Sequence, residues 1–431
     1  MKREDVAYRT YVEILKRELV PAMGCTEPIA IAYGSAKARA VLGEEPVRVK
    51  VLSSGNIIKN VKSVIVPHTG GMKGIAAAAA VGVLYGDAEA DLEVISAVSK
   101  EQIEQLPDKM KEIEFEIGAL DSDHVLDIEI TAESKDHVAK VRIMDEHTNV
   151  VEMTRDGVMV ENVSVRRDGC TDMIQEADGS EPDYSLLNVA DIVDFANTAD
   201  LSDVKGTLAR QLAYNTAISN EGLTGNYGAR IGQILLQQDD SVRTRAKAAA
   251  AAGSDARMNG CELPVVINSG SGNQGITASM PVLTYAKHYE KTEEELYRAL
   301  LVSNLVSVHL KTGIGRLSAY CGAVSAGVGA GAGIAYLLTG DLDVINHTIV
   351  NAVAINSGIV CDGAKASCAA KIAMAVDAGI LGYEMYQMDS QFYDGDGLVT
   401  KGVENTIANI AILGSEGMKE TDKTIIGIMT K

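Results

Sequence analysis

Three cysteines in the C-terminal half of the chain lie where a metal cluster could be bound. Cys321 stands in "AYCGAVSAG", and Cys361 and Cys368 stand in "IVCDGAKASC". Three thiolates from two segments can hold a [4Fe-4S] cluster and leave one iron open, which a Lewis-acid cluster needs. The spacing matches neither the ferredoxin patterns nor a CxxC zinc pattern. Cysteine is also a common small buried side chain in small-residue helices, so plain burial stays open as the alternative.

A fourth cysteine, Cys25 in "MGCTEPIAIA", is a candidate reactive thiol. Thr26 is predicted to cap the helix that follows, with Glu27 and Pro28 in its first turn. Cys25 would then lie at a helix N-terminus, where exposed N–H groups and the helix dipole favour a thiolate. Glu27 opposes this effect by repelling negative charge. A Gly-Cys turn without chemistry is the alternative interpretation.

Residues 266–282, "VINSGSGNQGITASMPV", are predicted to pass from an extended segment through a Gly-rich loop into a helix. Gly270, Gly272 and Gly275 would let backbone N–H groups converge on an anion, for which a carboxylate is the natural choice. No Gly-Lys-Ser/Thr follows, so the loop is not a Walker loop, and the acidic residue and βαβ context of a dinucleotide site are missing. A tight interhelical turn without a ligand is the alternative.

Two further Gly-rich polar loops, "SGNIIKN" and "VPHTGGMKG", could close over such a site. Their polar residues are Asn56, Lys59, Asn60, His68 and Lys73. His309 stands on an apolar helical face and is predicted to be a satisfied core histidine. Cys170 and Cys261 have no evident partner and are predicted to be structural.

Two kinds of structure must position these residues. Residues 1–45 have helical spacing and predict an N-terminal helical hairpin, whereas residues 46–165 mix alternating strands, expected to be antiparallel, with helices. Residues 166–187 are polar and Gly/Asp-rich, which is typical of a linker. Residues 188–431 predict a helical domain that binds the cluster. The expected fold class is therefore α+β, with a large helical catalytic domain, the hairpin packed on it, and a smaller α+β domain inserted.

Composition limits the function classes. The chain has 431 residues, of which 46% are hydrophobic and 23% charged, as in soluble globular proteins. A formal charge of −20 without a basic cluster disfavours nucleic-acid binding, because phosphates would be repelled. No secretory signal is evident, and the apolar run at 323–340 is too short and Gly-rich for a membrane span. We therefore expect a cytoplasmic protein that has no membrane segment and whose cysteines stay reduced.

Together, "VPAMGCTEPIA", "SGSGNQGI", "AYCGAVSAG" and "CDGAKASCAAK" resemble the iron–sulfur L-cysteine desulfidases, relatives of the iron–sulfur L-serine dehydratase α subunit. The resemblance runs from about Val20 to the C-terminus. It implies an oxygen-sensitive [4Fe-4S] cluster held by Cys321, Cys361 and Cys368. The dehydratases have a similar cysteine layout but lack "GCTEP", space the last two cysteines more widely, and carry a different Gly-rich loop. These departures favour the desulfidase branch.

The resemblance implies a pyridoxal-free α,β-elimination of L-cysteine to sulfide, pyruvate and ammonium. The substrate carboxylate would bind the "SGSGNQG" loop, and its sulfur would be drawn to the open iron, which stabilises developing charge. Cys25 is the candidate catalytic residue, as α-proton base or sulfide relay, with Lys365 and Lys371 as alternative bases. The implied substrate-binding residues are Ser269, Gly270, Ser271, Gly272 and Asn273.

Two other functions stay open. One is L-serine dehydration with the same cluster, for which Cys25 would be dispensable. The other is a non-catalytic iron–sulfur sensor, in which Cys25 would be a fourth ligand. The expected partner is a small amino acid, with no nucleic acid and no membrane. The oligomeric state is open, with a homodimer as one option.

Overall fold

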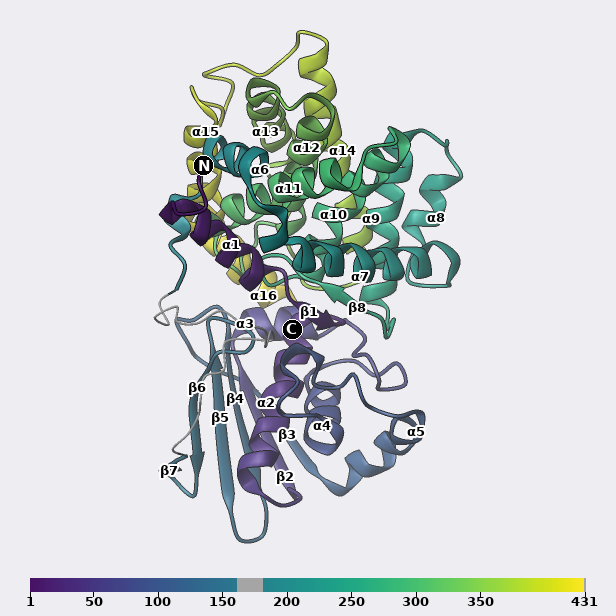
Figure 1. Ribbon diagram of the computed structural model, residues 1–431. Coiled ribbons are helices and arrows are strands. Elements are labelled where there is room, and N and C mark those ends of the chain that lie inside the picture. The colour runs from purple at the N-terminus through teal and green to yellow at the C-terminus, as the bar shows by residue number, and fades with distance from the viewer. Residues whose placement is uncertain (161–180, 430–431) are drawn as a thin grey trace.

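The protein has a helical part and a part built on a sheet, as the computed structural model shows for residues 1–160 and 181–429 (Figure 1). The helices lie above the sheet in this view, and the two parts meet at β1 and β8. The predicted α+β class is confirmed. Most of the predicted linker at 166–187, and Cys170 within it, lie outside the described residues.

The smaller part is a mixed sheet in the order β3-β2-β4-β5-β6-β7. Its elements are α2 (Thr26–Leu42), β2 (Arg48–Ser53), α3 (Gly55–Val61), α4 (Ile75–Tyr85), α5 (Lys100–Lys109), β3 (Glu114–Ala119), β4 (Asp127–Glu133), β5 (Val138–Met144), β6 (Val150–Arg155) and β7 (Val158–Met159). All neighbours pair antiparallel except β2 and β3, which run parallel. The expectation of antiparallel strands is therefore wrong for β3. Helices α3 to α5 separate it from β2 and form the crossover that a parallel pair needs.

One face of the sheet is apolar and the other is charged, as the period-two alternation of its strands predicts. Val51, Ile130 and Val141 are fully buried on the strands against which α2 and α4 pack. Charged side chains alternate with them, and Lys50 pairs with Glu116 at 2.9 Å across β2 and β3. The sheet is therefore covered by helices on its apolar face.

The larger part is helical. Its helices are α1 (Val6–Glu18), α6 (Val189–Thr198), α7 (Lys205–Thr224), α8 (Ile231–Leu236), α9 (Val242–Met258), α10 (Gly272–His288), α11 (Glu293–Ile314), α12 (Gly322–Thr339), α13 (Leu342–Asn356), α14 (Cys368–Gln387), α15 (Val403–Ile412) and α16 (Lys419–Met429). At its centre α12 packs against α10, α11, α13 and α14. A Cβ on Gly327 would lie 2.4 Å from the carbonyl oxygen of Ala375, so the absence of a side chain lets α12 and α14 approach closely.

Helix α12 is the one helix among the described residues that is long and apolar enough to cross a membrane. Of that stretch, 78% is buried inside the protein, which is typical of a core helix.

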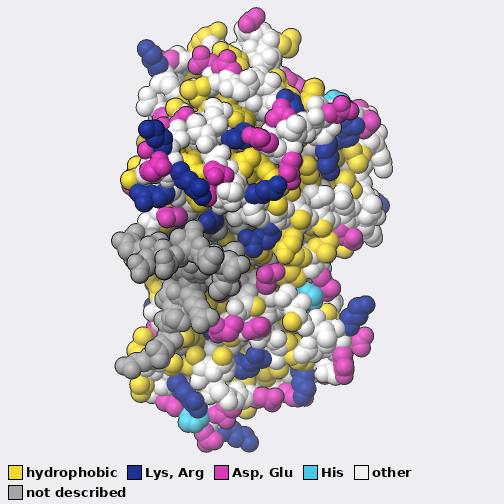
Figure 2. All heavy atoms as spheres, in the orientation of Figure 1, with side chains coloured by type: hydrophobic (Ala, Val, Ile, Leu, Met, Phe, Trp, Pro, Cys, Tyr) yellow, Lys and Arg dark blue, Asp and Glu magenta, His cyan; other side chains and the backbone are white. Residues whose placement is uncertain are grey.

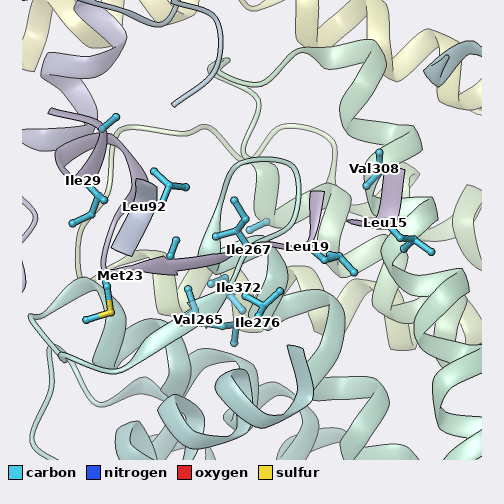
Figure 3. Packing of buried hydrophobic residues seen from close by; sticks show 14 of the residues in the cluster. Leu15, Leu19, Met23, Ile29, Leu92, Val265, Ile267, Ile276, Val308 and Ile372 are labelled. Carbon is cyan, nitrogen blue, oxygen red and sulfur yellow. The ribbon is translucent and has the colours of Figure 1, made fainter. Parts of the chain in front are cut away.

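A short ribbon joins the two parts, with β1 (Pro21–Met23) antiparallel to β8 (Pro264–Val266). Figure 3 shows Met23, Val265 and Ile267 around this ribbon, together with Ile276 of α10 and Ile372 of α14. All five belong to one buried apolar cluster. The hydrophobic core is thus continuous across the junction, and the junction can hold a site in a fixed geometry.

Residues 1–45 divide at this ribbon, which differs from the predicted hairpin on the helical domain. Helix α1 packs against α11, whereas α2 packs against α4 and strands β4, β5 and β6. The burial patterns explain the division. Helix α1 has one buried face, but nearly every side chain from Thr26 to Ala36 in α2 is buried. A helix that is buried all round needs more than one covering surface.

Candidate active site

A single pocket between the two parts brings together the four cysteines singled out in the sequence. It is lined by Cys25, Cys321, Cys361 and Cys368 among other residues. The pocket has about 710 Å³ of empty space, a figure that includes open solvent. Helix α3 contributes Asn56, Lys59 and Asn60 from one of the two predicted closing loops. His68 and Lys73 from the other loop do not line it.

Cys321 and Cys361 are held together by backbone pairing between their segments. The N–H of Cys361 donates to the carbonyl of Ala319 at 2.7 Å, and the N–H of Cys321 donates to the carbonyl of Ile359 at 3.1 Å. The hydrogen bond between the two cysteine side chains lowers the pKa of Cys361 to about 6, and the charge of Lys59 acts in the same direction. These interactions favour the thiolate form of Cys361, which is the form that binds metals.

Cys368 is the first residue of α14, and its thiol lies 3.7 Å from the carbonyl oxygen of Gly363. Lys365 and Lys371 both donate to the Asp362 carboxylate in the preceding loop. Neither lysine lines the pocket. The two lysines that the sequence left open as α-proton bases therefore fix the loop that leads to Cys368.

The three C-terminal thiols fit the donor set of a [4Fe-4S] cluster. Each thiolate in such a cluster binds a different iron, so the ligands stand wider apart than around one ion. In residues 1–160 and 181–429, no group of three His, Cys, Asp or Glu side chains is placed to hold a single metal ion. Lys59 and Lys311 are buried, act electrostatically on Cys361, and would offset the negative charge of bound thiolates. Burial lowers the pKa of Lys311 to about 8.

Cys25 itself is the N-cap of α2, and the predicted cap Thr26 is already helical. The Thr26 hydroxyl instead donates to the carbonyl of Gly270 at 2.9 Å. The Cys25 thiol donates to one oxygen of Glu27 at 2.9 Å, and the Asn60 amide donates to the other at 2.9 Å. Burial and the Glu27 charge raise the pKa of Cys25 well above its usual range. The helix N-terminus therefore does not make Cys25 a resting thiolate, because burial outweighs the dipole.

Glu27 is the buried carboxylate of the pocket. Burial acts to raise its pKa, but the charge of His147 in its protonated form, the hydrogen bond from Cys25 and the charge of Arg257 act in the opposite direction, and the pKa lies below its usual value. His147 reaches this region from the loop between β5 and β6. Cys25 and Glu27 thus form a protonated thiol bonded to an ionised carboxylate, a pair between which a proton can move.

The "SGSGNQG" loop forms a tight turn before α10. Asn268 and Ser271 exchange backbone hydrogen bonds of 3.1 and 3.0 Å, and the residues between them, Ser269 and Gly270, have φ of +49° and +78°. Positive φ at both central positions is typical of a type I′ turn. Of the predicted substrate-binding residues, the pocket is lined by Ser271 and Asn273, and not by Ser269, Gly270 or Gly272.

Gly275 has a packing role in place of the expected anion-binding one. Its N–H donates to the carbonyl of Ser271 at 3.1 Å, so it is not free for a ligand. A Cβ at this position would lie 2.0 Å from the carbonyl oxygen of Val266. Glycine is therefore needed here so that α10 can pack directly on β8.

Sequence reasoning missed several polar residues of the pocket. They are Glu27 as a proton acceptor, Arg257, Gln274, Lys311 and Arg316. A signal existed for two of them, because Arg257 ends the Ala-rich run of α9 and Lys311 interrupts the apolar helix α11. His309 bonds Glu404 at 2.7 Å, which confirms the predicted satisfied histidine.

The chain is similar in sequence to known proteins over most of its length. Residues 89–427 match the family model described as "Serine dehydratase alpha chain". The UPF0597 protein of Desulfitobacterium hafniense (strain Y51) is 56% identical over 430 residues, which cover 100% of this chain and 98% of that protein. The UPF0597 protein of Lachnoclostridium phytofermentans is 49% identical over 423 residues, with 98% and 99% coverage. That of Treponema denticola is 42% identical over 437 residues, with 100% coverage of both. The resemblance to relatives of the serine dehydratase α subunit is confirmed, and the chain belongs to the serine dehydratase alpha chain family.

Proposed function

We propose that the protein is a cytoplasmic [4Fe-4S]-dependent L-cysteine desulfidase, which converts L-cysteine to sulfide, pyruvate and ammonium. One observation carries the proposal: the Cys25 thiol, bonded to Glu27 at 2.9 Å, lines the same pocket as three further cysteines. Cys25 also packs in one small apolar cluster with Cys368. A proton-carrying group thus lies next to the predicted ligand set.

Cys321, Cys361 and Cys368 would hold the cluster, whose open iron would supply Lewis acidity to stabilise the charge on the leaving sulfur. Two buried lysines of the pocket would also stabilise negative charge on the leaving sulfur. Lys59 and Lys311 are buried cations near Cys361, and their positive charge favours the anionic products of C–S cleavage.

Cys25 and Glu27 would do the acid–base chemistry. As Cys25 takes the α-proton of L-cysteine, Glu27 takes the proton of the Cys25 thiol along the existing hydrogen bond. The electrons of the Cα–H bond form the Cα–Cβ double bond, and the C–S bond breaks to release hydrosulfide. The aminoacrylate that remains hydrolyses to pyruvate and ammonium.

L-serine dehydration is the second candidate, and the description of the matching family favours it. The same Cα–H removal would then release hydroxide in place of hydrosulfide. A non-catalytic iron–sulfur sensor would need Cys25 as a fourth ligand.

The proposal is tested with anaerobically reconstituted protein in which iron and acid-labile sulfide are quantified. Sulfide and pyruvate are measured from L-cysteine, and pyruvate from L-serine. Cys321→Ser should lose iron and activity together. Cys25→Ser should keep iron but lower sulfide release by about 10²- to 10⁴-fold, the usual contribution of a general base. Cys261→Ser is the control, because Cys261 is buried outside the pocket.

Sulfide release that follows iron content would support the desulfidase. Pyruvate from L-serine alone, with full activity in Cys25→Ser, would assign the dehydratase. Iron without either activity would leave the sensor, and wild-type protein that never binds iron would refute the cluster.

A further inference from the structure

Arg257 is a buried cation for which the fold supplies no salt bridge. It lies near the end of α9, is 2% exposed, and lines the pocket. Its Nε and Nη2 atoms are buried without a hydrogen-bond partner, and no salt bridge to it is found in residues 1–160 and 181–429. A buried guanidinium without a bonded anion is unfavourable, so this position points to a negatively charged ligand.

Glu27 is the acidic side chain that acts on Arg257 from within the pocket, but its oxygens already accept hydrogen bonds from other residues. Arg257 contributes to lowering the pKa of Glu27, so the two groups are near each other. However, one oxygen of Glu27 accepts from Cys25, and the other accepts from Asn60. Glu27 therefore offsets part of the charge of Arg257 without occupying its donors.

Gly272 makes room for the guanidinium at the amino end of α10. A Cβ at Gly272 would lie 2.4 Å from Arg257 Nε and 2.8 Å from its Cζ. The first N–H groups of α10, at Gly272, Asn273 and Gln274, have no acceptor within the helix. The guanidinium and the positive end of the α10 dipole therefore meet at one point of the pocket.

The side-chain oxygens beside this point are also without partners. Asn273 Oδ1 and Gln274 Oε1 are buried and accept no hydrogen bond from the described residues. Gln274 is 4% exposed and lies against Gly322, directly after Cys321, since a Cβ on Gly322 would be 2.7 Å from Gln274 Nε2. The unpartnered oxygens of Asn273 and Gln274 thus lie between the Arg257 guanidinium and the predicted cluster ligands.

We propose that Arg257 and the amino end of α10 bind the α-carboxylate of the amino-acid substrate, and that Gly272 is required to leave the guanidinium free. Asn273 and Gln274 then accept hydrogen bonds from the α-ammonium. This inference rests on the proposed function in that it assumes an amino-acid substrate. It adds a named carboxylate anchor, and it requires that the ligand carry a free carboxylate.

The test compares L-alanine with L-alaninamide as ligands of anaerobically reconstituted protein, by calorimetry. Neither has a β-leaving group, so neither is consumed, and only L-alanine has a carboxylate. Hydrogen bonds to charged groups predict that wild type binds L-alanine about 10- to 100-fold more tightly. Arg257→Gln should lose most of this preference while the affinity for L-alaninamide stays the same. Arg245→Gln is the matched control, because Arg245 lies on α9 outside the pocket.

Two further variants keep the test decisive if Arg257→Gln does not fold. Gly272→Ala should reduce the preference for L-alanine over L-alaninamide, because the new Cβ displaces the guanidinium. Arg257→Lys should also reduce it, because lysine keeps the charge but lacks the forked donors of arginine. An unchanged preference in folded Arg257 variants overturns the inference and leaves the proposed function standing. An equal loss of affinity for both ligands assigns Arg257 a structural role and also overturns it. A wild type that binds neither ligand and releases neither sulfide nor pyruvate overturns both.

Discussion

Gly275→Ala distinguishes two roles for the "SGSGNQG" loop. If Gly275 served an anion-binding nest, alanine would be tolerated, because alanine keeps the N–H. The structure predicts damage instead. The new Cβ would lie 2.0 Å from the carbonyl oxygen of Val266, whereas ordinary van der Waals contact begins at 3.4 Å. Helix α10 would therefore have to move away from β8 by about 1 Å or more.

The movement would reach the pocket, because Asn273 and Gln274 precede Gly275 on the same turn of α10. A displacement of about 1 Å can cost about 10²-fold in rate. Overpacking costs about 1–3 kcal/mol, from which the better helix propensity of alanine returns up to about 1 kcal/mol. We therefore expect Gly275→Ala to lower pyruvate release by about 10- to 100-fold and Tm by a few degrees.

The assay is pyruvate release at matched iron content, together with a thermal melt. Gly206→Ala is the control, because Gly206 lies on α7 and a Cβ there meets no atom within 4 Å. That variant should be neutral or more stable by about 0.5–1 kcal/mol. Wild-type activity and wild-type Tm in Gly275→Ala would refute the packing argument.

Three more outcomes are expected. Asp422→Ala leaves the buried ammonium of Lys59 without the carboxylate that binds it at 2.5 Å, so Tm should fall and amide exchange in α16 should rise about 10- to 100-fold; unchanged Tm and exchange would mean that other contacts hold Lys59 and α16. Burial raises the pKa of Asp255 to about 6, so wild type should lose stability relative to Asp255→Asn as pH rises from about 4 to about 6; parallel stability curves for the two proteins would contradict this. Removal of iron by a chelator should lower Tm, because a ligand that binds only the folded state stabilises it; an equal Tm with and without iron would exclude a bound cluster.

Local pattern predicted the elements well, because their burial follows their period. Val51 and Ile130 lie on strands whose alternation is visible in the sequence. The split of residues 1–45 was not accessible in this way. The sequences of α1 and α2 both have helical spacing. Only the tertiary fold decides that α1 packs on the helical part and α2 on the sheet.

The sequence predicted which types of residue form the site, but it did not predict which of them are in contact. Cysteine and glycine signals located the correct loops, but the meeting of Cys321 with Cys361 depends on backbone pairing between two loops far apart in sequence. The cap at Cys25 was misplaced by one residue, since Thr26 is already helical and its hydroxyl donates to the carbonyl of Gly270. Arg257 was missed because a charge at the end of an Ala-rich helix is usually exposed, and only the packing against Gly272 buries it.

The charge of the pocket is opposite to that of the whole chain, and this difference bears on the choice of substrate. The chain has a formal charge of −20, and Figure 2 shows acidic side chains interspersed with basic ones over the visible face. The pocket is lined by four cationic side chains, Lys59, Arg257, Lys311 and Arg316. The anionic groups among its lining residues are Glu27 and the thiolate that is favoured at Cys361. Salt screens surface charge beyond about 8 Å, so these buried cations dominate inside. A zwitterionic amino acid has no net charge for the surface to repel, yet its carboxylate and leaving group would meet cations once bound. A multiply anionic substrate, such as a phosphorylated one, would be repelled by the surface charge during its approach.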